Sequence, residues 1–190
     1  MRSRRWFIAL TSAVTGLGLL AAACSNSNGL PAASLENTVD TVSLFALTGT
    51  AIADPSGYAV DGKRLVRIDQ SPTADFVFDF DAATGRPSLY PTGAIHLGSA
   101  SALQRATTGF DAITIAPTGG YVFDSAFALD TGTVLLVRSR PTLCVYGATL
   151  SFYAKVRVLA VDSTARRLDF EILADENCGY LGLEPGLPSR

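Results

Sequence analysis

The chain contains few of the residues from which enzyme sites are usually built. Its 190 residues include one histidine, three cysteines, one methionine and one tryptophan. No glycine-rich phosphate loop follows a strand pattern, and no cluster of metal-ligand residues occurs at the spacing of a metal site. We therefore predict no catalytic residue, no metal site and no cofactor. The alternative is a hydrolase that uses His96, the only histidine, in a Ser–His–acid arrangement.

Charge is also sparse and unclustered. The only lysines are Lys63 and Lys155, and the arginines are scattered through the chain. A duplex-binding face requires a basic patch, so the sequence predicts no nucleic-acid partner. No charged residue occurs between Arg5 and Glu36, which leaves one long uncharged segment near the start.

That segment has the layout of an export signal. Met1-Arg2-Ser3-Arg4-Arg5 is basic, Trp6 to Leu20 is mostly apolar, and Ala21-Ala22-Ala23-Cys24 ends the run with small residues and a thiol. It resembles a bacterial lipoprotein signal. The resemblance implies that residues 1–23 are removed and that Cys24 carries fatty acyl chains such as palmitate. It also implies an exported protein, anchored by lipid to the cell membrane or the outer membrane.

Two other interpretations of the segment remain open. Ala21 stands where lipoprotein signals usually have leucine, so a plain secretory signal cut near Ala23 is one alternative. An uncleaved anchor is the other, although threonine, serine and glycine dilute the apolar run. Ser3 to Ile8 also resembles the twin-arginine export motif, so the export route stays open.

The cysteine count fits the lipid-anchor interpretation. With Cys24 assigned to lipid, Cys144 and Cys178 remain, and two cysteines in an exported chain most often form a disulfide. Without residues 1–23 the chain has 12 basic and 17 acidic residues, a net charge of −5. Charge alone would not attract such a protein to anionic lipid, so the anchor must hold it at the membrane.

The remainder of the chain has a period-two pattern. After a polar tether at 24–37, residues 38–190 are expected to form a single all-β, mainly antiparallel domain, a β-sandwich or barrel-like sheet. Strand patterns occur at 38–47, 75–81 and 87–90, and hairpins are expected over 58–68 and 125–139. Short helices are expected at 99–105 and 110–115.

The clearest hairpin joins two strands within 150–174. Apolar faces match when the paired residue numbers have an even sum, and a sum of 328 places Arg157 opposite Glu171. In Asp75 to Asp81, phenylalanines occupy one face while Asp75, Asp79 and Asp81 are expected on the solvated face. A calcium loop at Asp79–Asp81 is the less favoured alternative, because further ligands are missing.

Residues 132–174 resemble the C-terminal hairpins of HmuY-type haem-capturing lipoproteins. That family holds haem iron between two histidines, whereas this chain has only His96, so no haem-binding residue is carried over. The function expected from the sequence is a lipid-anchored envelope protein with a non-enzymatic binding or structural domain. Its partner would be an envelope protein or a small-molecule ligand, with haem as an alternative. Tyr90, Tyr121, Tyr153 and Tyr180 are candidates for a binding surface or for sheet packing.

Overall fold

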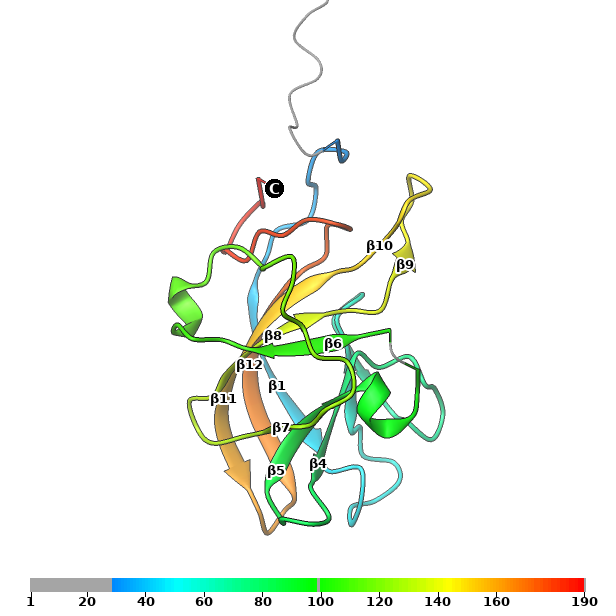
Figure 1. Ribbon diagram of the computed structural model, residues 1–190, viewed down its shortest axis with the longest axis vertical. Helices are drawn as coiled ribbons and strands as arrows, with labels where there is room; N and C mark the ends of the chain where they lie inside the picture. Colours follow the sequence, from blue (N-terminus) through cyan, green and yellow to red (C-terminus); the bar gives the residue numbers. More distant parts are fainter. Residues whose placement is uncertain (1–28, 99, 190) are drawn as a thin grey trace, which may run out of the picture.

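The computed structural model describes residues 29–98 and 100–189. The signal segment, Cys24 and Ser99 lie outside them. The described part contains two five-stranded antiparallel sheets and a separate two-stranded hairpin, arranged as a sandwich (Figure 1). The all-β prediction is confirmed. None of the described residues forms a helix long and apolar enough to span a bilayer.

Sheet I has the strand order β1-β12-β11-β8-β6. Its strands are β1 (Val39–Phe45), β12 (Arg167–Asp175), β11 (Tyr153–Asp162), β8 (Val134–Arg138) and β6 (Ala102–Arg105). Sheet II has the order β3-β2-β4-β5-β7. Its strands are β3 (Arg64–Val66), β2 (Gly57–Ala59), β4 (Phe76–Phe80), β5 (Pro87–Pro91) and β7 (Phe127–Ala128). The separate hairpin pairs β9 (Thr142–Leu143) with β10 (Thr149–Leu150).

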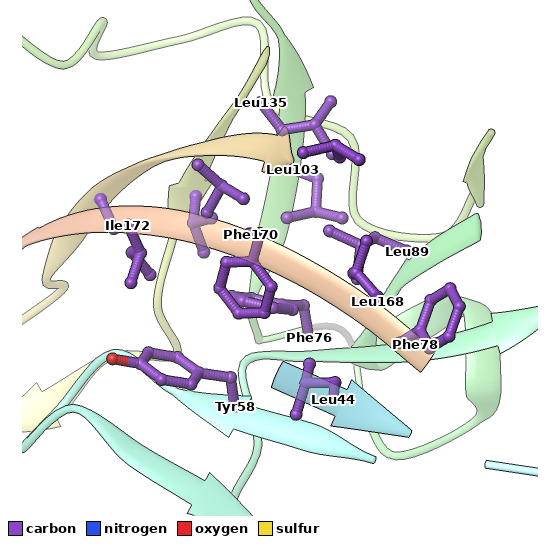
Figure 2. Packing of buried hydrophobic residues seen from close by; sticks show 14 of the residues in the cluster. Leu44, Tyr58, Phe76, Phe78, Leu89, Leu103, Leu135, Leu168, Phe170 and Ile172 are labelled. Atoms are coloured by element: carbon purple, nitrogen blue, oxygen red, sulfur yellow. The ribbon is translucent and has the colours of Figure 1, made fainter. Parts of the chain in front are cut away.

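The main core lies between the two sheets. Phe170 of sheet I meets the rings of Tyr58 and Phe76 of sheet II, with centroids 6.1 and 5.9 Å away (Figure 2). Leucines from both sheets, including Leu44 and Leu89, surround these rings and are fully buried. The expected phenylalanine face of β4 is therefore confirmed, because Phe76 and Phe78 are core residues and Phe80 packs against them. Every strand and core cluster of the described residues lies within 37–186.

The register of β11 and β12 is the predicted one over most of its length. Arg157 is opposite Glu171, and the two side chains form an ion pair. The register shifts by one residue between Val158 and Ala160, because Leu159 is accommodated as a β-bulge. The bulge exchanges the faces beyond it: Val161, rather than the expected Ala160, packs against the core.

A second apolar cluster covers the outer face of sheet I. Phe110 and Ile113 pack there against Leu136 of β8, whose neighbours Leu135 and Val137 face the main core. This arrangement explains why β8 is apolar on both faces. Buried Lys155 fixes the covering segment, because its Nζ donates to the carbonyls of Phe110 (3.0 Å) and Ile113 (2.9 Å).

Neither of the two expected helices forms as predicted. Residues 102–105 form β6, which pairs with β8 and buries Leu103 in the core, so packing overrides local helix propensity. At 110–115 only one 3-10 turn forms, η2 (Phe110–Ala112). A second 3-10 turn, η1 (Thr92–Ile95), was not expected.

The expected hairpin over 125–139 was also wrong. The turn near Asp130 exists, but β7 pairs with β5 in sheet II whereas β8 pairs within sheet I. The turn therefore carries the chain from one sheet to the other. The hairpin over 58–68 is confirmed as β2–β3, and the return strand at 87–90 is confirmed as β5.

Replacing the central ring should weaken the sandwich strongly. We expect Phe170→Ala to lower the free energy of unfolding by about 3–5 kcal/mol, because it leaves a cavity where the sheets meet. Leu159→Ala is the control, since Leu159 is partly exposed in the bulge, and it should change stability by no more than about 0.5 kcal/mol. Urea unfolding of residues 25–190, followed by circular dichroism, measures both values. Equal losses in the two variants would contradict the packing described here.

Candidate functional site

The predicted disulfide is present at one end of the sandwich. Cys144 and Cys178 are bonded, with a Cα–Cα distance of 6.0 Å. Cys144 lies in the β9–β10 hairpin and Cys178 follows the end of β12. The hydroxyl of Tyr146 also donates to the Cys178 carbonyl (2.5 Å). The hairpin is therefore fixed to the segment after β12 by one covalent bond and one hydrogen bond.

The segment that enters the domain is held at the same end. The Asn177 side-chain oxygen accepts the backbone N–H groups of Ser34 (2.9 Å) and Leu35 (3.0 Å), and its amide group donates to the Leu35 carbonyl. The Tyr180 hydroxyl donates to the Pro31 carbonyl (2.6 Å). From Pro31 onward, the expected tether (24–37) is therefore bound to the domain.

A cavity of about 390 Å³ lies between this entering segment and the disulfide-bonded hairpin. Its volume is within the range of about 300–1,000 Å³ found for small-molecule sites. Most of the lining is apolar or aromatic, and the only charged side chains in it are acidic. The lining residues are Pro31, Ala32, Ser34, Leu35, Asp61, Thr142, Leu143, Cys144, Val145, Tyr146, Phe152, Glu176, Asn177, Cys178 and Tyr180. The sequence did not predict this pocket, although it singled out three of its residues: both cysteines and Tyr180.

A buried carboxyl group supports the wall of the pocket. Asp175 is fully buried, and its Oδ1 accepts the backbone N–H and the side-chain amide of Asn177, both at 2.8 Å. Burial raises the pKa of Asp175 to about 6, since desolvation disfavours the charged form.

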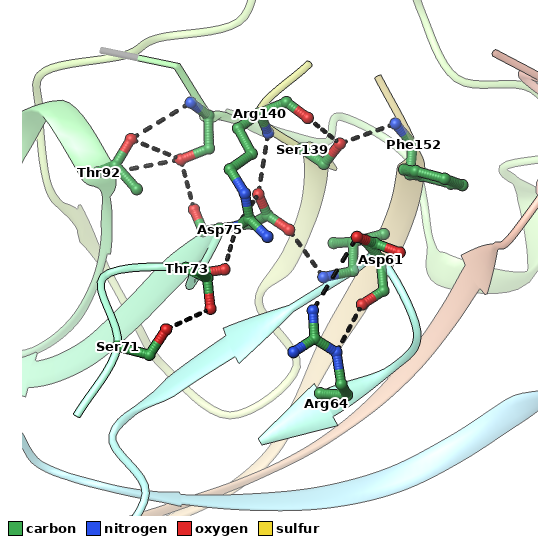
Figure 3. A network of polar contacts seen from close by, with 11 residues as sticks. Asp61, Arg64, Ser71, Thr73, Asp75, Thr92, Ser139, Arg140 and Phe152 are labelled. Atoms are coloured by element: carbon green, nitrogen blue, oxygen red, sulfur yellow. Dashed lines mark hydrogen bonds and ion pairs between the residues drawn. The ribbon is translucent and has the colours of Figure 1, made fainter. Parts of the chain in front are cut away.

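Asp75 corrects another expectation. It was placed on the solvated face of its strand, but it is fully buried. Its carboxylate accepts the N–H groups of Val60 (2.8 Å) and Arg140 (2.9 Å) and forms an ion pair with the Arg140 side chain (Figure 3). Val60 follows β2 and Asp75 precedes β4 of sheet II, whereas Arg140 follows β8 of sheet I. This network therefore joins the two sheets.

The other acids of that strand also have local partners. Asp79 pairs with Arg166 (3.2 Å), and Asp81 accepts the N–H and hydroxyl of Thr84 in the β4–β5 turn. Among residues 29–98 and 100–189, no group of three or more His, Cys, Asp or Glu side chains is placed to hold a metal ion. These contacts give Asp79 and Asp81 partners within the fold.

His96 lies apart from the pocket. It is exposed, follows η1 with a left-handed φ of 62°, and its ring forms no hydrogen bond with any described residue. No serine–histidine–acid arrangement is formed by the described residues around His96.

The candidate tyrosines mostly pack within the fold. The ring centroids of Tyr121 and Tyr153 are 6.2 Å apart, and Tyr180 is only 3% exposed.

The pH dependence of stability tests the burial of Asp175. Its pKa is about 6 in the folded protein, above the unfolded value of about 3.9. The free energy of unfolding contributed by this group should therefore fall as pH rises from about 4 to about 6. Burial raises the pKa of Asp75 as well, so the free energy of unfolding contributed by Asp75 should also fall as pH rises.

Comparison with Asp175→Asn isolates the contribution of Asp175. The variant should gain about 2–3 kcal/mol relative to the wild type between pH 4 and pH 7, because it carries no charge to bury. Urea unfolding at each pH gives the two curves. Parallel curves for the two proteins would contradict a raised pKa at Asp175.

The chain matches no family model, no curated protein and no solved structure in the comparisons made. The resemblances noted in the sequence, to lipoprotein signals and to HmuY-type hairpins, therefore remain predictions.

Proposed function

We propose that this protein is a lipid-anchored protein of the cell envelope, and that its β-sandwich is a non-enzymatic module that binds a small, mainly apolar ligand. One observation carries the proposal: the 390 Å³ pocket is built from the segment that leads to Cys24 and from the disulfide-bonded hairpin. The anchor and the binding site would thus share one end of the molecule.

The anchor is supported by the sequence and by the use of the cysteines. Because Cys144 and Cys178 are bonded to each other, Cys24 is left as the one thiol available for lipid. A single acyl chain gives only marginal membrane binding, whereas two give stable attachment. Lipoprotein cysteines of the type that Cys24 resembles carry at least two.

The chemistry of the lining favours a mainly apolar ligand that is not an anion. Phe152, Leu143 and Tyr146 offer apolar and aromatic contact area, while Ser34 and Asn177 supply polar groups that can orient a bound molecule. The two charged lining residues, Asp61 and Glu176, are both acidic and would repel an anion. Their nearest cations, Arg64 at 4.0 Å and Lys63 at 3.7 Å, do not line the pocket.

A neutral apolar dye tests the pocket. Residues 25–190, which contain all the strands and core clusters described above, are titrated with 1-N-phenylnaphthylamine, and its fluorescence is followed. We expect saturable binding at one site. Ala32→Trp should weaken it by roughly tenfold or more, because the larger ring fills part of the cavity.

Ala83→Trp is the matched control for the dye experiment. Ala83 is exposed in the β4–β5 turn and does not line the pocket, so this variant should bind like the wild type. Equal affinity in the Ala32 variant, or the absence of saturable binding, would refute the proposed site. If the dye binds as expected, native mass spectrometry of the protein from its source envelope would identify the natural ligand.

The lipid anchor is tested on the full chain after export. The intact mass should lack residues 1–23 and include the added acyl chains, and the protein should enter the detergent phase on phase separation. Cys24→Ala should lose the acyl mass, whereas Ser25→Ala keeps the thiol and should retain it. A wild-type chain cut after Ala23 without acyl mass would show that the segment is a plain secretory signal.

A further inference from the structure

The β9–β10 hairpin presents an apolar tip to solvent. Leu143 is 70% exposed and Val145 is fully exposed, with Tyr146 beside them. No charged residue occurs between Pro141 and Ala154. Buried apolar side chains are the rule in a core, but exposed ones that cluster at one tip indicate a contact surface. We call Leu143, Val145 and Tyr146 the hairpin tip.

The hairpin tip is held in a fixed position. Within the turn, Cys144 N–H donates to the Ala148 carbonyl (2.8 Å), and Gly147 N–H donates to the Cys144 carbonyl (2.9 Å). Gly147 has a φ of 86°, a conformation that glycine adopts without strain. The disulfide and the Tyr146–Cys178 hydrogen bond then join the turn to the segment after β12. The apolar side chains are thus presented by a rigid projection.

The hairpin tip lies at the same end of the molecule as the entering chain. Figure 1 shows the hairpin and the segment beginning at Gly29 projecting at one end of the sandwich. Pro31 and Leu35 of that segment line the same pocket as Val145 and Tyr146. Gly29 is five positions after Cys24 in the sequence, and a fully extended chain over five positions spans at most about 18 Å. A lipid on Cys24 would therefore hold this end close to the bilayer.

We propose that the hairpin tip inserts into the interfacial layer of the membrane beside the lipid anchor, so that the pocket end of the domain faces the bilayer. This inference rests on the proposed lipid anchor. Leucine and valine side chains gain from burial at the acyl boundary, and tyrosine suits the headgroup level because its ring is apolar and its hydroxyl is polar. Because the lipid anchor would already hold the domain at the membrane, the hairpin tip would meet the bilayer at a high effective concentration. A small apolar tip is then sufficient for the contact.

Charge supports a bilayer as the occupant. The mature chain has a net charge of −5, so acidic groups near an anionic lipid surface would be repelled. The stretch from Pro141 to Ala154 places neither sign of charge at the surface. The hairpin tip would therefore contact the bilayer through apolar burial, whereas the acidic pocket residues Asp61 and Glu176 favour a lipid surface without anionic headgroups.

The exposed Ile52 provides a matched comparison. Ile52 is 74% exposed and lies in the loop after β1. The last residue of β1, Phe45, pairs with Arg167 at the start of β12. Cys178 follows the other end of that strand, which is about 27 Å long, so Ile52 and the hairpin lie toward opposite ends of sheet I. A bilayer in contact with the hairpin tip would not reach Ile52.

Single tryptophans test the orientation. The only tryptophan, Trp6, lies in the segment removed with the signal, so Val145→Trp and Ile52→Trp each give the mature protein one reporter. The acylated proteins are reconstituted into phosphatidylcholine vesicles with or without brominated acyl chains. Val145→Trp should emit at shorter wavelength on vesicles and lose roughly half or more of its emission to bromine quenching. Ile52→Trp should show neither change.

The outcomes separate this inference from the lipid anchor. Co-flotation with vesicles and no quenching at position 145 would overturn the membrane contact and leave the anchor standing. Equal quenching of both reporters would overturn it too, because the domain would then have no preferred face. A blue shift that grows with protein density and is not quenched would assign the hairpin tip to a second copy of the chain. A protein that does not co-float refutes the anchor and this inference together.

Discussion

The contact of Phe170 with Tyr58 and Phe76 is the interaction on which the sandwich depends. It joins β12 of sheet I to β2 and β4 of sheet II, and the leucines of the core pack around it. Because β12 pairs with β1 on one side and β11 on the other, the position of Phe170 also fixes the faces of both neighbouring strands. A slip of one residue in β12 would turn this ring toward the outer face.

The same strand determines where the candidate site forms. Asp175 ends β12, Asn177 follows it, and Cys178 bonds to the hairpin. The register that buries Phe170 therefore also places the groups that hold the entering segment and the hairpin. The pocket is a consequence of the sheet's register, and the chain needs no separate domain to build it. At the other face of sheet I, Lys155 fixes the covering segment in a similar way, through backbone carbonyls.

Patterns in the sequence were sufficient to predict some features of the fold. The period of two and the Arg157–Glu171 pair were sufficient to predict the register of β11 and β12, and the cysteine count was sufficient for the disulfide. The burial of Asp75 was missed because its partner Arg140 is 65 residues away. The turn near Asp130 was recognised, but a turn signal does not say which sheet the next strand joins. The pocket was missed because its walls come mainly from three separate segments, at 31–35, 142–146 and 176–180, together with Asp61 and Phe152.

The hydrogen bonds of Asn177 and Tyr180 have a mechanical consequence for an anchored domain. Any drag on the domain would be transmitted to the lipid through residues 31–35, so these bonds would bear load before strand β1 does. They are few, whereas β1 is paired along its whole length with β12. Under force the entering segment would therefore detach first and lengthen the tether, while the sandwich stayed folded.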